Sequence, residues 1–542
     1  MVVIEFTKGD LLSLVKKEMS KQEIEEVLFL LKCETEWNEE MIQCEFGPDR
    51  QDMFSVEGIA RAVKGYLGLE RGVPKYSMEE SKLVVKTEEP VARPFIACAI
   101  IEDVNLTDDM VKSLMQMQEK LHGGIGRNRK KAAIGVHDFD RTKGNFLYKD
   151  VDPEKMKFVP LGEKNEMFLR EVLEKHTKGI EFKHLLEHHK TWPAIVDDHG
   201  VVSFPPIINS ERTRVSDKTK NLFIDVTGTD KNAVMHSLNI IVTNILERTG
   251  KLKSVKVDRT TYPDLEPKQW TLDISDVNKI LGFNLDEKQI ADALERMRHT
   301  VMKFKGGKMS ISVAPYRTDI LHTIDLIEDI AVGYGYNNIE PEFPKSPEIG
   351  CLSKLEEHSE KVREVMIGLD LQEYSGFILT NKSDLFDKMG ADKKEVAEIL
   401  NPVTADYSIC RSWLLPSIMK MLAANKHREY PQKVFEIGDC VILDDESETM
   451  TKNNRKLVGA IAHDKANLTE MKSVVEALLT NLGVKYKIEP WHHKSFIENR
   501  CGEIFSEGRS VGFFGEIHPQ VLENWKLERP VIAFEIDLDA IR

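Results

Sequence analysis

Four acidic side chains are concentrated in the stretch Pro315 to Asn338, which reads PYRTDILHTIDLIEDIAVGYGYNN. They are Asp319, Asp325, Glu328 and Asp329. Carboxylates this close repel one another unless a positive charge lies among them, and Mg²⁺ prefers oxygen ligands of this kind. Arg317 and His322 could neutralise them instead, and the helix dipole would favour a solvated acidic helix start. The residues alone therefore allow a metal site, an ion-pair cluster or an exposed helix face.

The element that would position these acids is an amphipathic helix. Asp319 stands where a helix N-cap belongs, with its carboxylate available to the free N–H groups of the first turn. Apolar residues follow from Ile320 to Ala331 at three- and four-residue steps, and the three later acids share another face. Gly333 and Gly335 are predicted to end the helix.

A second group of polar residues lies on a predicted strand with the sequence NLFIDVTGTD. Alternation along a strand places Phe223, Asp225 and Thr227 on one face. An acid and a hydroxyl on that face would suit a polar pocket. Asp225 could instead pair with Arg212 or Arg214, and composition alone favours that pairing.

The segment before this strand, VVSFPPIINS, is predicted to run from a strand into a rigid double-proline bend. The bend at Pro205 and Pro206 would hold Ser203 and Asn209 near the polar face of the next strand. The two segments together predict a small, ordered polar pocket.

A basic, glycine-rich segment, GGIGRNRKK, lies earlier in the chain. Its cations are Arg127, Arg129, Lys130 and Lys131. A glycine-rich turn flanked by cations can hold a phosphate, but the segment lacks the GK[ST] ending of a P-loop and the strand–turn–helix setting of a dinucleotide fingerprint. Two interpretations remain open, a solvated basic loop and a contact with an RNA backbone.

The whole chain sets limits on these interpretations. Its 542 residues exceed what one core holds, so several domains are expected. The net charge of −15 means that any contact with nucleic acid must be local or supplied by a partner. No apolar run of about eighteen residues and no signal peptide is evident, so we expect a cytoplasmic protein that does not enter a membrane. Seven scattered cysteines without a CxxC pair argue against zinc and disulfides.

Several motifs resemble those of the phenylalanyl-tRNA synthetase beta-subunit family. YRTDI with the later acids and GYGYNNI resembles its B5 module, and GPDR followed by SVEGIAR is similar to its first module. SFPPIIN and FIDVTGTD look like the B3/B4 editing module of the archaeal–eukaryotic branch. The blocks LNPVTADYSICRSWLLPSIMK, KVFEIGDCV and FFGEIHPQVLENW resemble the catalytic-like B6/B7 domain.

The fold that this resemblance implies is α+β and multidomain. Its expected parts are a B1-type small module at residues 1–78, a B3/B4 editing module at 79–262, a winged-helix-like B5 module at 263–343, and a class II synthetase-like B6/B7 domain without an active site at 344–542.

The resemblance also implies functions for the two polar groups. The four acids Asp319, Asp325, Glu328 and Asp329 match positions assigned to magnesium that is shared with an alpha subunit. Asp225 and Thr227, and less directly Ser203, match positions of a pocket that hydrolyses tyrosine wrongly attached to phenylalanine tRNA. We expect direct attack by an oriented water there.

The expected assembly is an alpha2-beta2 tetramer that binds tRNA(Phe) and uses ATP on the alpha subunit. Arg411 is the one arginine in the motif-2-like region, and no second arginine stands where a nucleotide site would need it, so no ATP site is assigned to this chain. Helix Leu355 to Ile367 carries an apolar stripe that predicts a partner interface. Its members are Leu355, Val362, Val365 and Met366. The rival interpretations are a stand-alone hydrolase of misacylated tRNA, formed by residues 80–260, and a non-catalytic scaffold that binds RNA or a partner.

Overall fold

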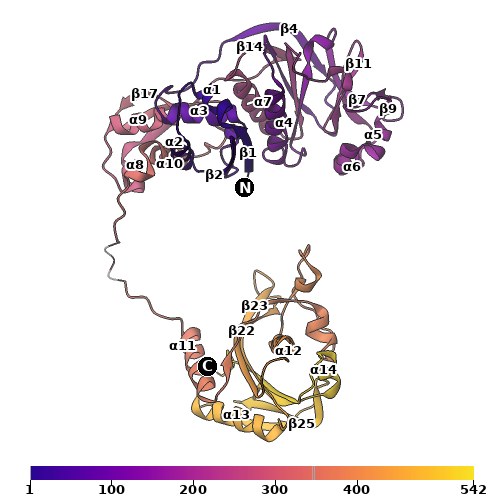
Figure 1. Ribbon diagram of the computed structural model, residues 1–542, viewed down its shortest axis with the longest axis vertical. Coiled ribbons are helices and arrows are strands. Elements are labelled where there is room, and N and C mark those ends of the chain that lie inside the picture. Colours follow the sequence, from indigo (N-terminus) through magenta and orange to yellow (C-terminus); the bar gives the residue numbers. More distant parts are fainter. Residues whose placement is uncertain (1, 345, 347, 542) are drawn as a thin grey trace. The chain divides into compact units, whose positions relative to one another are not determined.

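The computed structural model describes residues 2–344, 346 and 348–541, and the chain forms two compact units, Met1–Phe343 and Pro344–Arg542 (Figure 1). The first unit contains a three-stranded sheet, a ten-stranded sheet and a second three-stranded sheet, all with helices packed on them. The second unit is built on a seven-stranded sheet. The protein is therefore multidomain and α+β.

The first three-stranded sheet has the order β1-β3-β2 and is antiparallel. Its strands are β1 (Val2–Thr7), β2 (Cys33–Asn38) and β3 (Met41–Phe46), and its helices are α1 (Lys8–Val15), α2 (Lys21–Leu30) and α3 (Val56–Tyr66). Ser55 caps α3 by accepting a hydrogen bond from the Gly58 N–H at 3.3 Å. Helix α2 ends at Leu30, and Cys33 already begins β2.

The ten-stranded sheet has the order β12-β11-β10-β7-β4-β14-β5-β13-β6, with β15 beside β14. Its strands are β4 (Met78–Thr87), β5 (Phe95–Glu102), β6 (Ala132–Asp138), β7 (Phe146–Val151), β10 (Trp192–Asp197), β11 (Gly200–Phe204), β12 (Ile208–Asn209), β13 (Leu222–Gly228), β14 (Lys251–Val257) and β15 (Thr260–Tyr262). The two ends of the sheet meet, since the Asn209 Nδ2 of β12 donates to the Val136 carbonyl of β6 at 3.3 Å. A cavity forms at this junction.

Two long helices cover the ten-stranded sheet. Helix α7 (Lys231–Leu246) packs on β5, β13 and β6, and α4 (Asp108–Gly123) packs on α7 and β6 (Figure 1). Two shorter helices, α5 (Leu169–Lys175) and α6 (Thr177–Phe182), follow the two-strand ribbon of β8 (Lys157–Phe158) and β9 (Met167–Phe168). Helix α7 is almost completely buried, and it therefore fixes the strands that carry the polar residues.

The third sheet of the first unit has the order β16-β18-β17. The elements are β16 (Lys268–Asp273), α8 (Ile274–Leu281), α9 (Glu287–Arg296), β17 (Thr300–Lys305), β18 (Lys308–Val313) and α10 (Thr323–Tyr334). The predicted start of α10 was wrong, because His322 is the N-cap and Asp319 belongs to the preceding turn. Gly333 lies inside the helix, and Gly335, with a φ of 95°, ends it.

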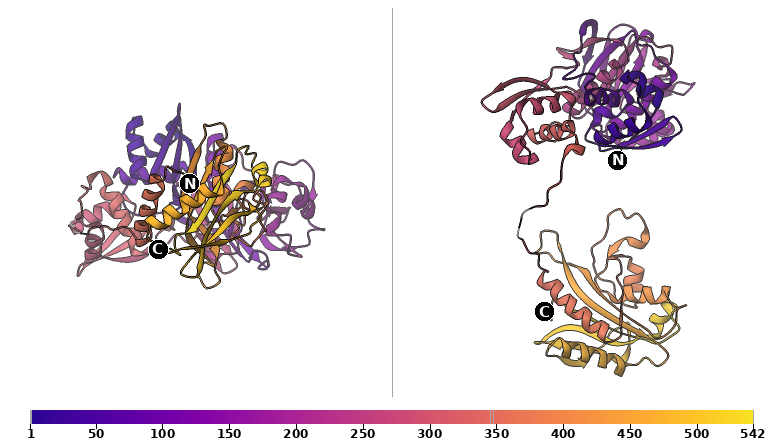
Figure 2. Two further views of the ribbon diagram at one scale, coloured as in Figure 1. Left: turned by 90° about the horizontal axis from the view of Figure 1, so that it is seen from below. Right: turned by 60° about the vertical axis from the view of Figure 1, so that its left-hand side comes forward.

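The seven-stranded sheet of the second unit has the order β19-β22-β23-β27-β26-β25-β24. Its strands are β19 (Gln372–Glu373), β22 (Gln432–Leu443), β23 (Thr451–Ala462), β24 (Lys487–Pro490), β25 (Phe496–Ser506), β26 (Arg509–Ile517) and β27 (Val531–Asp537). Helices α11 (Lys354–Gly368) and α13 (Leu468–Asn481) lie side by side on one face, and α12 (Leu415–Ala424) packs on the same sheet with a separate core (Figure 2). The short α14 (Pro519–Asn524) starts after its N-cap His518, as predicted.

The apolar stripe of α11 belongs to the core of the second unit. Val362 and Met366 are fully buried there, and Leu355 and Val365 are half-buried. The prediction that this stripe forms a partner interface was therefore wrong. Periodicity identified the buried face of the helix, but the seven-stranded sheet and α13 cover it.

Within the described residues, no helix is long and apolar enough to cross a membrane. All seven cysteines are free thiols.

Candidate functional site

A cavity of about 590 Å³ lies at the junction of the two ends of the ten-stranded sheet. Three of the four residues that the sequence predicted for a pocket line it, namely Ser203, Asn209 and Asp225. The Pro205–Pro206 bend forms another part of the wall. Residues from distant parts of the chain, such as Glu119 of α4, complete the lining.

Asp225 is buried on β13, which lies between β5 and the end strand β6. Its Oδ2 lies 2.8 Å from the His137 Nε2 of β6. The predicted pairing with Arg212 or Arg214 was wrong, because each arginine has a nearer acid. Arg212 pairs with Asp197 at 2.8 Å, and Arg214 pairs with Glu211 at 3.0 Å, one turn before it.

Ser203 and Asn209 face each other across the double-proline bend. They are directly paired in the β11–β12 register, and the Ser203 hydroxyl donates to the Asn209 Oδ1 at 3.1 Å. The Asn209 amide also donates across to β6. Both side chains are thus ordered by the protein itself, which pre-organises this wall of the cavity.

Thr227 lies on the same strand face as Asp225 but does not line the cavity. It is fully buried and accepts hydrogen bonds from Arg93, at 3.3 Å on its hydroxyl and 2.6 Å on its carbonyl. Arg93 also donates to the carbonyls of Arg129 and Lys130, so it ties the basic turn to the end of β13. Burial lowers the pKa of Arg93 to about 10. Sequence analysis did not identify this arginine, since its partners are distant in the chain.

The basic turn divides into one buried and three exposed cations. Arg129 donates to the Pro206 and Ile207 carbonyls at 3.1 and 3.0 Å, and its guanidinium lies 4.3 Å from the centre of the Phe182 ring. It supports the cavity wall through these contacts and, unlike the other three cations of the turn, is buried. Its exposed neighbours are Arg127, Lys130 and Lys131, of which Lys131 pairs with Asp230 at 3.0 Å.

Helix α4 contributes a charged pair to the cavity wall. The His122 Nε2 accepts a hydrogen bond from the Ile134 N–H at 2.8 Å, so this nitrogen carries no proton. Burial lowers the pKa of His122. The His122 ring, whose Nδ1 lies 3.7 Å from the Glu119 Oε1, and the nearby Arg129 guanidinium lower the pKa of Glu119 to about 2. Glu119 is therefore an anion at neutral pH, and it lines the same cavity as Asp225.

The four acids of the α10 region line a second, smaller cavity of about 80 Å³. Arg317 pairs with Asp319 and with Asp329, each at 2.6 Å. His299 also bonds Asp329 at 2.6 Å. Burial works to raise the pKa of Asp329, but Arg317 and His299 outweigh it and hold this pKa below its ordinary value.

The two outer acids have partners as well. Asp325 accepts hydrogen bonds from the Leu321 and His322 N–H groups, both at 2.7 Å, and Glu328 pairs with Lys32. In the part of the chain that the structure describes, no group of three or more His, Cys, Asp or Glu side chains is arranged to hold a metal. Within this chain, each of the four acids is paired with a basic side chain or a backbone N–H group.

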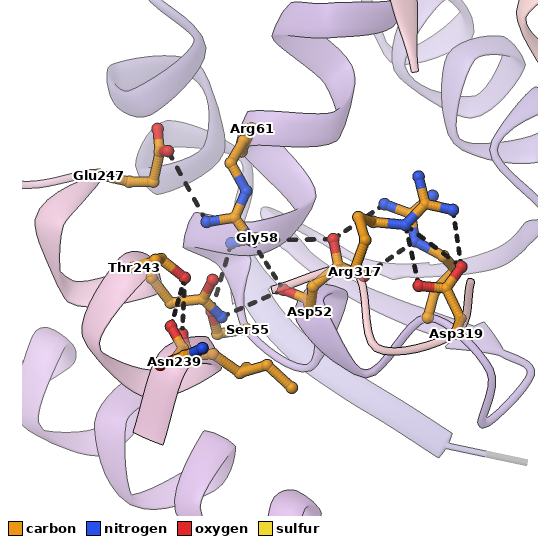
Figure 3. A network of polar contacts seen from close by, with 12 residues as sticks. Asp52, Ser55, Gly58, Arg61, Asn239, Thr243, Glu247, Arg317 and Asp319 are labelled. Atoms are coloured by element: carbon orange, nitrogen blue, oxygen red, sulfur yellow. Dashed lines mark hydrogen bonds and ion pairs between the residues drawn. The ribbon is translucent and has the colours of Figure 1, made fainter. Parts of the chain in front are cut away.

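A buried polar network joins the three sheets of the first unit behind this cluster (Figure 3). The Asn244 amide of α7 donates to the Ser55 hydroxyl and the Asp52 carbonyl at 3.0 and 3.1 Å. The Arg61 guanidinium lies 3.7 Å from the centre of the Tyr316 ring. These contacts tie α7, which packs on the ten-stranded sheet, to the start of α3, and they tie α3 to the turn before α10.

Comparisons with known proteins agree with this arrangement. The B3/4 domain family matches residues 94–249, the tRNA synthetase B5 domain family matches residues 270–336, and the phenylalanyl tRNA synthetase beta chain CLM domain family matches residues 339–538. The phenylalanine–tRNA ligase beta subunit of Thermococcus sibiricus is 43% identical, over 98% of this chain and 97% of its own length. The chain belongs to the phenylalanine–tRNA ligase beta-subunit family.

Other members of the family match equally well. The beta subunit of Methanocaldococcus jannaschii is 42% identical over 99% of this chain and 100% of its own length. The crystal structure of an N-terminal fragment of the phenylalanyl-tRNA synthetase beta subunit from Pyrococcus horikoshii has a TM-score of 0.59 and 37% identity. It covers 61% of this chain and 99% of that fragment.

In the second unit of this chain, buried charged side chains pair with other groups of the same unit. Arg411 is buried, pairs with Glu436 at 2.7 Å and donates to the Asp439 carbonyl at 3.0 Å. Glu535 accepts hydrogen bonds from two backbone N–H groups and pairs with Lys456 at 3.0 Å. The Arg411 guanidinium is thus directed at protein groups.

Proposed function

We propose that this chain is the beta subunit of a phenylalanine–tRNA ligase and that its large cavity hydrolyses tyrosine wrongly attached to tRNA(Phe). A partner alpha subunit attaches phenylalanine with ATP and Mg²⁺, and two copies of each chain form the complex. The family membership supports the subunit assignment. The observation that carries the editing proposal is the buried carboxylate of Asp225 in the wall of the 590 Å³ cavity.

The chemistry of the cavity suits a phenol. A synthetic site made for phenylalanine rejects an added hydroxyl only weakly, so a second site must recognise that hydroxyl. The Asp225 carboxylate is an acceptor for the phenolic O–H, and Ser203 and Asn209 offer further polar groups in the same wall. When phenylalanine enters, this buried acceptor stays unpaired, which typically costs about 1–3 kcal/mol.

In the proposed reaction, a water oxygen adds to the ester carbonyl carbon of tyrosyl-tRNA. The bond between that carbon and the ribose oxygen breaks, and a proton from the water passes to the ribose oxygen. The products are free tyrosine and tRNA. The protein's part is to hold the aminoacyl end so that water reaches the carbonyl.

We also propose that Arg127, Lys130 and Lys131 contact the tRNA backbone. They are exposed on the turn whose buried Arg129 lines the cavity, so they lie near its edge. Because the chain carries a net charge of −15, such a contact is local. Replacing Arg127 and Lys130 with Ala should weaken tRNA binding and reduce the salt dependence of the affinity by about one to two phosphate contacts. An unchanged salt dependence would show that these side chains are solvated and do not contact the tRNA.

The magnesium prediction concerns the assembled enzyme. The four acids line one cavity, but each has a partner in this chain, so a bound cation would have to replace Lys32 or the backbone donors. We therefore derive no step of the reaction from magnesium at these residues.

The editing proposal is tested with the complex of this chain and its alpha subunit. Asp225→Ala is expected to lower the ratio of tyrosyl-tRNA to phenylalanyl-tRNA hydrolysis by about ten- to a hundredfold, with phenylalanine attachment unchanged. Tyrosyl-tRNA should then accumulate in charging reactions that contain tyrosine. Asp217→Asn, at an exposed acid of the same module, is the matched control. If Asp225→Ala clears tyrosyl-tRNA at the parent rate, the editing site lies elsewhere.

Measuring tyrosyl-tRNA hydrolysis also distinguishes the rival interpretation, a stand-alone hydrolase, from the subunit interpretation. Residues 80–260 would then suffice, and the chain without an alpha subunit would hydrolyse tyrosyl-tRNA as fast as the complex does. The family match over residues 339–538 favours the subunit interpretation, because a hydrolase has no need of that unit.

A further inference from the structure

A fully buried histidine stands directly behind the Asp225 carboxylate. His137 lies on β6, and its side chain does not line the cavity, although those of its neighbours Asp225 and Thr213 do. The His137 Nε2 is 2.8 Å from the Asp225 Oδ2, and the His137 Nδ1 is 2.8 Å from the Thr213 Oγ1. Among the described residues, His137 is the only hydrogen-bond donor to this carboxylate.

The hydrogen-bond partners determine which nitrogen carries the proton. A carboxylate only accepts, so the His137 Nε2 is protonated and donates to Asp225. The Nδ1 then accepts from the Thr213 hydroxyl, which has the Ser210 carbonyl, at 3.3 Å, as its other acceptor.

A glycine provides the space for this bond. Gly135 is the residue directly opposite Asp225 in the β6–β13 register, and His137 follows it on the same face. A Cβ atom at position 135 would lie 2.1 Å from the Asp225 Oδ2 and 2.8 Å from the His137 Nε2. Any side chain at position 135 would therefore displace the carboxylate or the ring.

The ring itself is fixed by packing. Its centre lies 6.0 Å from that of Phe223, the residue opposite His137 on β13, and Phe223 also packs edge-on against Phe146 at 4.6 Å. His137 is therefore held from both ring nitrogens and from one face. A side chain fixed this firmly transmits its position to its hydrogen-bond partner.

We propose that His137, in the space left by Gly135, is a positioning residue for tyrosine selectivity. It holds the Asp225 Oδ2 and leaves the second carboxylate oxygen to accept the phenolic hydroxyl of a tyrosyl group in the cavity. Without the Nε2–H donor, the carboxylate can turn toward other donors or away from the cavity, and the difference between tyrosine and phenylalanine shrinks. This inference rests on the proposed editing function.

A purely structural histidine makes a different prediction. Its loss would lower the stability of the first unit and slow the hydrolysis of both esters alike. A positioning histidine changes the ratio of the two hydrolysis rates, and a side chain that restores a donor near Nε2 restores that ratio. The test therefore compares the variants by the ratio of their tyrosyl-tRNA and phenylalanyl-tRNA hydrolysis rates.

The experiment uses the complete complex with the alpha subunit, and it measures single-turnover hydrolysis of tyrosyl-tRNA(Phe) and phenylalanyl-tRNA(Phe). His137→Leu, which removes the donor, should lower the ratio about tenfold or more, and His137→Gln, whose amide nitrogen can reach Asp225, should recover most of it. Gly135→Ala should lower the ratio by a similar factor. His236→Gln, at a half-buried histidine of α7 in the same module, is the control. Phenylalanine attachment should stay at the parent rate in all variants.

A tyrosine-to-phenylalanine ratio within twofold of the parent in a folded His137→Leu variant overturns the proposal. Equal loss of both activities, or no recovery in His137→Gln, does so too. If His137→Leu does not fold, Gly135→Ala decides the question by the same ratio. Failure of the editing function itself is seen separately, as an Asp225→Ala variant that keeps the parent rate and ratio.

Discussion

The polar residues that line the large cavity are each held by a second group inside the protein. His137 holds Asp225, the Val136 carbonyl holds Asn209, and the Pro206 and Ile207 carbonyls hold Arg129. These bonds form before any ligand arrives, so binding does not have to order the side chains. Selectivity between two substrates that differ by one hydroxyl needs such order, because a mobile acceptor could re-pair when the hydroxyl is absent.

His122 makes the same cavity sensitive to acid. Burial lowers its pKa below the ordinary value of about 6.5, so the folded chain binds this proton less readily than the unfolded chain does. The contribution to stability is therefore complete above about pH 6.5 and is lost as the pH falls below it. Protonation of Nε2 would also break its bond with the Ile134 N–H. We expect faster hydrogen exchange of the β6 amides at pH 5 than at pH 7, after correction for intrinsic exchange.

The control for this prediction is His122→Gln, whose amide oxygen can accept from Ile134 but does not titrate. In this variant the protection of β6 should vary less between pH 7 and pH 5 than in the parent. The half-buried His236 and His493 and the buried His299 also have lowered pKa values, so global stability alone would not isolate His122. The same pH response in parent and variant would contradict the prediction.

At the scale of elements, helix α10 shows how one set of acids serves its own chain. Asp325 caps the helix through two backbone N–H groups, while Arg317 joins the turn before the helix to Asp329 within it. Removing a capping side chain typically costs about 0.5–2 kcal/mol. We therefore expect Asp325→Ala to lower the stability of the isolated chain by about 1 kcal/mol, equally with Mg²⁺ and with a chelator. Asp276→Asn, in the first turn of α8 and exposed, is the matched control.

The measurement is thermal unfolding of the isolated chain, followed by association with the alpha subunit across a Mg²⁺ titration. A magnesium-dependent loss of stability in the isolated chain would show that the acids hold a cation there. A magnesium-dependent loss of association in the complex alone would support the family's assignment of magnesium to these residues at the subunit junction.

The sequence predicted elements better than their partners. The shared face of Asp225 and Thr227 follows from the alternation of side chains along a strand. The partner of Asp225 could not be predicted from local patterns, because His137 lies 88 positions away and the β6–β13 register is a tertiary property. The alternation of Gly135 and His137 in AAIGVHD was the available signal, since a glycine and a polar ring on one strand face indicate a close approach.

Two other predictions failed for the same reason. The spacing that made Asp319 look like an N-cap cannot show that Arg317 draws its carboxylate into the preceding turn. The stripe on α11 has the period of a buried face, and periodicity does not say whether a partner or the same chain covers that face. Hydrophobic periodicity predicts which face of a helix is buried, but only the folded structure shows which element packs against that face.

At the scale of the whole molecule, the second unit keeps its charges paired and exposes apolar side chains elsewhere. Arg411, Glu436 and Lys456 are paired inside the unit. Leu400 and Val403, in the loop before β21 (Ile409–Cys410), are 99% and 102% exposed, and Phe377 is also mostly exposed. Exposed apolar groups of this size on a folded unit mark an interaction surface. With the α11 stripe buried, this loop is the better candidate for contact with the alpha subunit.

We therefore expect the chain alone to show no phenylalanine-dependent exchange of pyrophosphate with ATP, and the complex to show it. Leu400→Asp with Val403→Asp should raise the concentration of alpha subunit needed for half-maximal exchange by about tenfold, since each substitution removes buried apolar area and adds a charge. Met450→Asp, at an exposed apolar residue of another loop in the same unit, is the control. Exchange by the chain alone would place the synthetic site here. An unchanged requirement for the alpha subunit in the double variant would place the interface on another surface, because a charge cannot be buried in an apolar contact without cost.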